Sequence, residues 1–311
     1  SCIVNKKLNI DVKVNMKFKN IKRCFYALGF AFICTLSHSS FAEEKLTSKD
    51  IKVLNQKADQ GDLQAIQALI VMYGEGKQVT QDSKKAMEYA QKGIVLGDLK
   101  SKYTASMMYL HGVGNIQKDS IKAEKLLTEL AEMGNVQAQI ALGSHYLTGD
   151  LLPKNQVLGL KWTEAAAKQN NGLALNNLGW LYYKGTGVKQ DYKKAVAYLE
   201  QGTQQNNALA YGNLATLYGR GHGVKQSDQK AFELLKKSAE LGQASAKFNL
   251  ALAYYQGTGT KVDQQKAYEL MQEAAQAGVP QAIEALQNQA SNQQGCREVQ
   301  SVVKGKTYTA I

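Results

Sequence analysis

The sequence predicts an all-α fold, a solenoid built from antiparallel pairs of helices. Small residues recur every 36 residues, with one interval of 37, in the series Ala65, Ser101, Ala138, Ala174, Ala210, Ala246 and Ala282. A tyrosine follows eight residues after each of the first six. A self-similar period of this length is typical of stacked helical repeats and not of a globular enzyme.

Each repeat contains the signals of a first helix followed by a tight loop. In the unit that begins at Ala174, one apolar stripe at helical spacing predicts a helix from Ala174 to Lys184. The glycine pair Gly185 and Gly187 then ends this helix, because glycine adopts positive φ without steric cost. The pair recurs in the next two units, as Gly221/Gly223 and Gly257/Gly259.

A second helix follows, and the sequence marks both of its ends. Residues whose side chains accept hydrogen bonds from free backbone N–H groups stand at the predicted N-cap: Asp82, Asp119, Asp191, Ser227 and Asp263. Residues that tolerate a left-handed backbone stand at the predicted C′ position: Gly61, Gly97, Gly134, Asn170, Asn206, Gly242 and Gly278.

The motif ALNNLGWLYYKGTGVKQDYKKA, which begins at Ala174, resembles the Sel1-like repeat family, relatives of the tetratricopeptide repeats. The resemblance covers about residues 61 to 290. It implies a right-handed superhelical solenoid of about six repeats that serves as a protein-binding scaffold, without one fixed activity. The unit at Ala138 departs from the motif, with Leu-Thr-Gly-Asp-Leu-Leu-Pro in its loop, so we expect that loop to have a different shape.

The ends of the chain differ from the repeats. Residues 16–42 predict a signal peptide, because a basic start at Met16 is followed by an apolar run and by the small-x-small site Ser40-Phe41-Ala42. We expect cleavage after Ala42, an untranslated extension over 1–15, and a periplasmic or secreted protein. The apolar run is shorter than the ~20 residues that span a bilayer, so no stable membrane span is expected. The repeat array is predicted as one body over 43–290, with lone helices as caps over 46–60 and 282–290, and a non-repeat tail over 291–311.

Composition argues against two classes of protein. The chain has a formal net charge of +12, but residues 1–42 hold seven basic residues and one acidic residue, which leaves +6 for the remainder. This charge is spread along the surface without interleaved aromatic residues, so we expect no nucleic-acid partner. Only Cys296 remains after cleavage, so stability must come from helix packing and not from an intramolecular disulfide.

A search for catalytic chemistry predicts no enzyme, metal or cofactor. His38, His111, His145 and His222 are scattered, whereas zinc needs convergent ligands. The S-x-x-K pattern occurs at Ser227 and at Ser301, without the S-D-N or K-T-G motifs of the penicillin-recognising enzymes. Ser227 is explained as an N-cap. Some members of the resembling family carry a β-lactamase label, so a cell-wall hydrolase is kept as the alternative function.

The strongest functional signal is a surface of aromatic and apolar residues. Two residues after Ala174, a side chain lies about 200° around the helix axis, which directs Asn176, Trp180 and Tyr183 away from the stripe of Ala174. The predicted partner-binding residues are Tyr103, Met107, Asn176, Trp180, Tyr183, Phe248 and Tyr255. By resemblance they line the concave face and bind a protein or peptide. Packing between adjacent first helices and binding of glycan or peptidoglycan remain open as alternatives.

Overall fold

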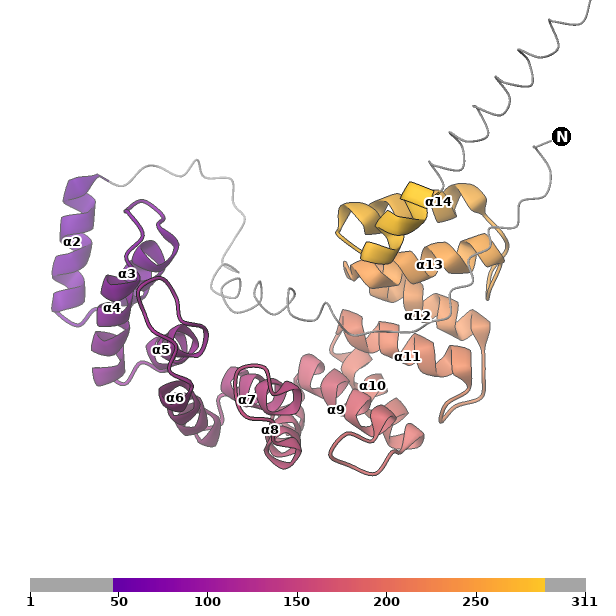
Figure 1. The fold of residues 1–311 in the computed structure, drawn as a ribbon, viewed down its shortest axis with the longest axis horizontal. Coiled ribbons are helices and arrows are strands. Elements are labelled where there is room, and N and C mark those ends of the chain that lie inside the picture. The colour runs from indigo at the N-terminus through magenta and orange to yellow at the C-terminus, as the bar shows by residue number, and fades with distance from the viewer. Residues whose placement is uncertain (1–46, 289–311) are drawn as a thin grey trace, which may run out of the picture. The chain divides into compact units, whose positions relative to one another are not determined.

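The computed structural model describes residues 47–288, and its regular secondary structure there is all α-helical (Figure 1). This confirms the predicted fold class. The segments 1–15 and 16–42 and the tail 291–311, which includes Cys296, lie outside the described residues. The helices are α2 (Ser48–Asp59), α3 (Leu63–Glu75), α4 (Ser83–Val95), α5 (Leu99–His111), α6 (Ser120–Glu132), α7 (Val136–Thr148), α8 (Gln156–Lys168), α9 (Gly172–Lys184), α10 (Tyr192–Gln204), α11 (Ala208–Arg220), α12 (Asp228–Glu240), α13 (Ala244–Gln256) and α14 (Gln264–Gln276).

The chain divides into two compact units, and the boundary falls inside α6, after Leu126. We call the part before it unit 1 and the part after it unit 2. The described residues of unit 1 begin with α2, and those of unit 2 end with a helical stretch over 280–288. The predicted caps over 46–60 and 282–290 stay a prediction, because their outer residues lie outside the described part of the chain. A single cooperative array over 43–290 stays a prediction.

Helix pairs are the building blocks of both units. We call α3, α5, α7, α9, α11 and α13 first helices, and α4, α6, α8, α10, α12 and α14 second helices. In unit 2, each first helix packs against the second helix of its own repeat and, from α9 onward, against the second helix of the preceding repeat. The first helices α9 and α11 also contact each other directly. A first helix therefore has packed neighbours on two sides.

Side-chain caps fix where the helices begin. The predicted second-helix N-caps are confirmed, because each accepts a hydrogen bond from a backbone N–H two or three residues later: Asp82, Asp119, Asp191, Ser227 and Asp263. Five of the six first helices are capped in the same way, although the sequence prediction did not include these caps: Asp62, Asp98, Asn135, Asn171 and Asn207. Helix α13 has Gln243 at its N-cap position, without a side-chain cap hydrogen bond. Each cap satisfies backbone donors that the helix itself leaves free.

Left-handed residues fix where the second helices end. All seven predicted C′ residues have positive φ; Gly61 follows α2, and the other six follow the second helices. The two asparagines among them, Asn170 and Asn206, have φ of 59° and 53°. The left-handed conformation costs an ordinary L-residue about 1–2 kcal/mol, and asparagine is one of the few types that adopt it routinely. The link from a second helix to the next first helix is therefore specified locally.

The loop inside each repeat is closed by one backbone hydrogen bond. The N–H of the second-helix N-cap donates to the carbonyl of the repeated tyrosine at 2.8–3.0 Å, in the pairs Asp82–Tyr73, Asp119–Tyr109, Asn155–Tyr146, Asp191–Tyr182, Ser227–Tyr218 and Asp263–Tyr254. The same bond forms in all six repeats. This common closure accounts for the nearly constant spacing between the tyrosine and the N-cap.

The second glycine of the G-x-G pair packs against the preceding repeat. A Cβ at Gly223 would lie 2.4 Å from the Tyr192 carbonyl oxygen, and one at Gly259 would lie 2.2 Å from the Asp228 carbonyl oxygen. Both carbonyls belong to the start of the previous second helix. Glycine is needed here for lack of space as well as for its positive φ of 77° and 70°.

The loop after α7 has a different shape from the G-x-G loops, as its sequence predicts. Gly149 ends the helix with φ of 71°, but no second glycine follows, and Leu152 is buried instead. The Asp150 carboxylate accepts a hydrogen bond from the Thr148 hydroxyl at 2.6 Å and lies 3.1 Å from Nδ1 of His145. Burial raises the pKa of Asp150, but these hydrogen bonds outweigh it and lower the pKa below its usual value.

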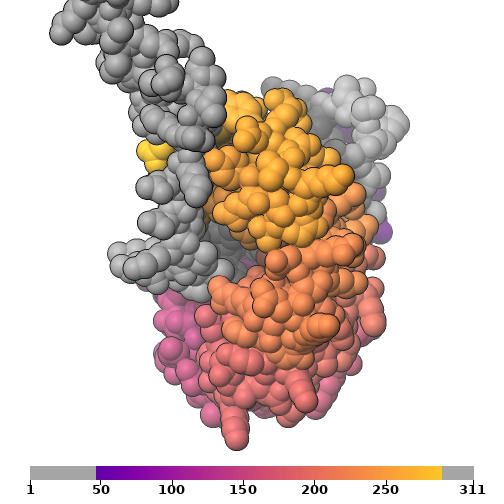
Figure 2. Space-filling model, turned by 90° about the vertical axis from the view of Figure 1, so that its right-hand side faces the viewer, coloured from indigo at the N-terminus to yellow at the C-terminus, as the bar shows by residue number. Residues whose placement is uncertain are grey.

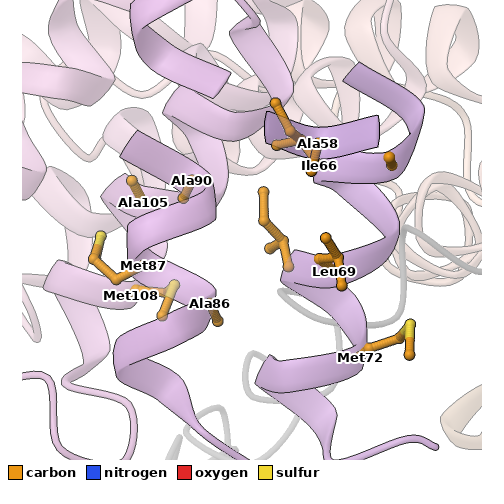
Figure 3. Close-up of a cluster of buried hydrophobic side chains, with 11 residues drawn as sticks. Ala58, Ile66, Leu69, Met72, Ala86, Met87, Ala90, Ala105 and Met108 are labelled. Atoms are coloured by element: carbon orange, nitrogen blue, oxygen red, sulfur yellow. The ribbon is translucent and has the colours of Figure 1, made fainter. Parts of the chain in front are cut away.

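The core of unit 1 is formed by α3, α4 and α5. Ile66 and Leu69 of α3 lie opposite Ala86 and Ala90 of α4, and Met108 of α5 belongs to the same buried cluster (Figure 3). Alanine on α4 lets the helix axes approach closely, because ridges of small residues interlock at short separation. Helix α2 packs against α3.

The core of unit 2 runs as a series of buried clusters from repeat to repeat. Figure 2 shows the atoms of this unit in contact from one colour to the next, from pink through orange. Leu199 of α10 and Leu217 of α11 are fully buried, beside Ala195 and Ala210.

Among residues 47–288, no helix is both long enough and apolar enough to cross a bilayer.

Candidate functional site

The first helices of unit 2 bury two stripes of side chains. On α9, Ala174, Leu178 and Leu181 belong to a cluster with alanines of α8, the preceding second helix. On the other side, a Cβ at Gly179 would lie 2.8 Å from Leu199 of α10, the second helix of the same repeat. Tyr183 lies on this second stripe. Only the remaining side of the helix is left to solvent.

The structure places the predicted site residues on two different stripes. Asn176, Tyr183 and Phe248 lie on the stripe that faces the second helix of the same repeat. Tyr103 and Tyr255 hold the positions equivalent to Asn176 and Tyr183 in their own repeats. Asn176 and Tyr183 are both only 5% exposed, and Phe248 packs against the cluster of Ala274, Val279 and Ala282. The spacing of apolar residues indicates one buried stripe, whereas a first helix in the stack has two, because it packs against a second helix on each side. Partner binding by these five residues stays a prediction.

Met107 and Trp180 lie on the remaining, partly exposed stripe. The Trp180 ring stacks on Tyr183, with centroids 4.9 Å apart. Nζ of Lys184 lies 5.0 Å from the centroid of the Trp180 ring, a cation–π arrangement. Trp180 is therefore held in place by neighbours while part of its ring faces solvent.

We define the first-helix surface as the solvent-facing stripe of α9, α11 and α13. Its residues are spaced by four, three and four positions along each helix, and each is exposed or partly exposed. They are Leu173, Asn177, Trp180 and Lys184 on α9, Leu209, Asn213, Thr216 and Arg220 on α11, and Ser245, Asn249, Leu252 and Gln256 on α13. Sequence reasoning missed most of this surface. The signal that could have found it is the row of asparagines at a spacing of 36 residues.

An aromatic cluster beneath this surface joins two repeats. Nη1 of Arg220 donates a hydrogen bond to the Tyr183 hydroxyl at 2.9 Å. The ring of His222 stacks on Tyr192, with centroids 4.5 Å apart, and lies 5.8 Å from Tyr183. These contacts place the Arg220 guanidinium next to the first-helix surface.

In unit 1, burial alone raises the pKa of the Tyr103 hydroxyl, consistent with a packing position.

The S-x-x-K pattern at Ser227 has a structural role. The Ser227 hydroxyl accepts a hydrogen bond from the backbone N–H of Lys230 at 3.2 Å, as an N-cap does, so this S-x-x-K pattern marks a helix start. Within the described range, no group of three or more histidine, cysteine or acidic side chains converges as a metal site would require. An open polar hollow of about 420 Å³ lies at the start of α4, lined by residues that include Asp82, Ser83 and Asn115.

Comparison with known proteins identifies the class of the chain. A model of the Sel1 repeat matches residues 68–98, 103–135, 136–171, 172–207, 208–243 and 244–279. The protein therefore belongs to the Sel1 repeat family, a family of scaffold folds that typically serve protein–protein interaction. None of the curated proteins that were compared matches the chain.

Two solved structures support this assignment. One is a protective antigen present in uropathogenic Escherichia coli strains that displays an SLR fold, with 27% identity and a TM-score of 0.64. The match covers 76% of this chain and 50% of that chain, so our protein spans about half of the antigen's length. The other is a Sel1 repeat protein from Oxalobacter formigenes, with 27% identity, a TM-score of 0.63, and coverage of 73% of this chain and 99% of that chain.

Proposed function

We propose that this protein is an exported scaffold that binds a protein or peptide partner through the first-helix surface of unit 2. The observation that carries the proposal is Trp180, a large aromatic side chain that remains partly exposed while its ring stacks on the buried ring of Tyr183. Tryptophan is among the residue types most enriched at the centres of protein interfaces. The family supports the proposal, since Sel1 repeats typically serve protein–protein interaction.

The physical basis of binding would be a surface that is already ordered. Both flanks of α9 are packed, and Trp180 is held between Tyr183 and Lys184, so little side-chain entropy is lost when a partner binds. Partly exposed leucines such as Leu209, which is 38% exposed, offer further apolar area. The partner would bury these side chains.

We expect Trp180→Ala to weaken partner capture by about tenfold or more, because truncating a tryptophan at the centre of an interface, as a hot spot, costs about 2 kcal/mol or more. The measurement is affinity capture from bacterial envelope extracts with the purified chain as bait, followed by quantitative mass spectrometry. The envelope roles left open are assembly, secretion, host interaction and neutralisation of an effector, and the identity of the captured protein chooses among them.

The matched control is Val157→Ala, which truncates a side chain on α8 that is 76% exposed. This variant should capture the same proteins as the parent chain, and both variants should keep the parent's helicity. Equal losses for the two variants would show that binding does not depend on the first-helix surface. Retention by insoluble peptidoglycan, with loss in the Trp180→Ala variant, would support the glycan alternative instead.

We also propose export, with cleavage after Ala42. The support is the basic start at Met16, the apolar run that follows it, and the small-x-small site that ends at Ala42. When the reading frame from Met16 is expressed in a Gram-negative host, the mature protein is expected to begin at Glu43 and to fractionate outside the cytoplasm, while Ala42→Arg blocks cleavage. N-terminal sequencing of the fractions measures both. A cytoplasmic protein that retains Met16 contradicts the proposal.

A further inference from the structure

A row of asparagines crosses the first-helix surface. Asn177, Asn213 and Asn249 hold the same position on α9, α11 and α13, at intervals of 36 residues. Asn177 and Asn213 are partly exposed and Asn249 is exposed. The same position in earlier first helices holds Ala68, Thr104 and Ala141, so the row is confined to the three repeats that carry the first-helix surface.

Two amides of the row are oriented by a buried asparagine outside it, Asn176. Nδ2 of Asn213 donates a hydrogen bond to Oδ1 of Asn176 at 2.8 Å, and Nδ2 of Asn176 donates to Oδ1 of Asn177 at 3.2 Å. These two hydrogen bonds use the carbonyl oxygen of Asn177 and the NH₂ group of Asn213. The NH₂ group of Asn177 and the carbonyl oxygen of Asn213 can therefore bond to a ligand. Reversing all three amides would exchange the two roles, so in either case one end donates and the other accepts.

An extended polypeptide matches this arrangement. Its backbone presents N–H donors and C=O acceptors in alternation, and an amide side chain can bond to both kinds of group. Asn249 adds a third amide, and no hydrogen-bond partner of its side chain is found within residues 47–288. The asparagine row therefore offers hydrogen bonds to a main chain and not to one particular side chain.

The charge of the surface selects the kind of polypeptide. The first helices α7, α9, α11 and α13 contain no aspartate or glutamate, whereas the second helices α8, α10, α12 and α14 all contain acidic residues. Lys184 and Arg220 end two adjacent first helices and are exposed, and neither is paired with a carboxylate in the described part of the chain. An acidic ligand would meet two cations and no opposing carboxylate on these helices.

We infer that the first-helix surface binds an extended, acidic polypeptide segment of a partner protein. The asparagine row pairs with the main chain of the segment, Lys184 and Arg220 pair with its carboxylates, and Trp180 packs against one of its apolar side chains. This inference rests on the proposed function, because it names the partner chemistry of the same surface.

The test uses the full chain and a short fluorescent peptide that alternates glutamate with leucine and serine. Its anisotropy titration is compared with that of a peptide in which glutamine replaces every glutamate, and with an acidic peptide whose backbone is N-methylated at alternate residues. We expect the acidic peptide to bind at least about tenfold more tightly than either, because each counterpart lacks the carboxylates or the main-chain donors. Equal affinities for the three peptides overturn the inference.

Two variants locate the contacts. Asn249→Leu and Lys184→Gln are each expected to weaken binding of the acidic peptide about fivefold, the usual scale of one lost hydrogen bond or partly exposed ion pair. The control is Gln201→Leu, an amide-to-leucine change at an exposed position of α10, which should leave the affinity unchanged. A single-stranded oligonucleotide of equal charge that binds as tightly as the peptide would indicate attraction by charge alone and would also overturn the inference.

The inference and the proposed function can fail separately. If Trp180→Ala loses its captured protein while Asn249→Leu and Lys184→Gln keep it, the first-helix surface binds a partner but does not recognise an acidic main chain. If Trp180→Ala captures the same proteins as the parent chain, the proposed function itself falls.

Discussion

Replacing Gly259 by alanine is expected to lower the free energy of unfolding by about 2–5 kcal/mol, the sum of a left-handed backbone penalty and of overpacking. The new Cβ would lie 2.2 Å from the carbonyl oxygen and 2.6 Å from the carbonyl carbon of Asp228. These are backbone atoms of the preceding repeat, which cannot move aside as a flexible side chain can. Urea unfolding followed by far-ultraviolet circular dichroism measures the loss.

Gly242→Ala is the matched control. Gly242 also has a positive φ, of 87°, but a Cβ there would meet no atom within 4 Å. Its cost should therefore be the backbone penalty alone, about 1–2 kcal/mol. Gly242→Asn should cost less still, since Asn170 and Asn206 hold the same position in other repeats. Equal losses for Gly259→Ala and Gly242→Ala would show that the contact between the loop and the preceding repeat contributes nothing.

The helix boundaries could be predicted from the sequence because local chemistry sets them. A second helix begins where an N-cap such as Asp191 accepts backbone hydrogen bonds, and it ends where a residue such as Asn206 adopts positive φ. Both signals act within a few residues. The first-helix N-caps carry an equally local signal, since an aspartate or asparagine such as Asp62 or Asn171 directly follows the C′ residue.

The faces of the first helices could not be predicted in the same way. A helical wheel finds the stripe of Ala174, but it does not show how many neighbours the helix has. The structure shows that Asn176 and Tyr183 pack toward α10, so the surface left for a partner is centred about Trp180 and not about Tyr183. The contact between Asn213 and Asn176 likewise depends on how successive repeats stack. The sequence of a single repeat does not show this stacking.

The asparagine row shows how a repeat protein can place function on its scaffold. Its members share a position with Ala68 and Ala141 of other repeats, so the stack does not require an amide there. The buried Asn176, by contrast, orients the amides on both sides of it through the bonds to Asn177 and Asn213. An unpaired buried amide is costly, so we interpret Asn176 as a residue that positions the surface.

The central claim is that the first-helix surface of unit 2 is the face that meets a partner, and site-specific photo-crosslinking tests it most directly. The photoreactive residue benzoylphenylalanine is introduced in place of Thr216, at the middle of this surface on α11, and separately in place of Ala197, at an exposed position on the second helix α10. After irradiation in envelope extracts, the account predicts a crosslinked complex from position 216 and none from position 197, with loss of the complex when Trp180→Ala is added. A complex that forms from position 197 alone, or equally from both positions, would contradict it.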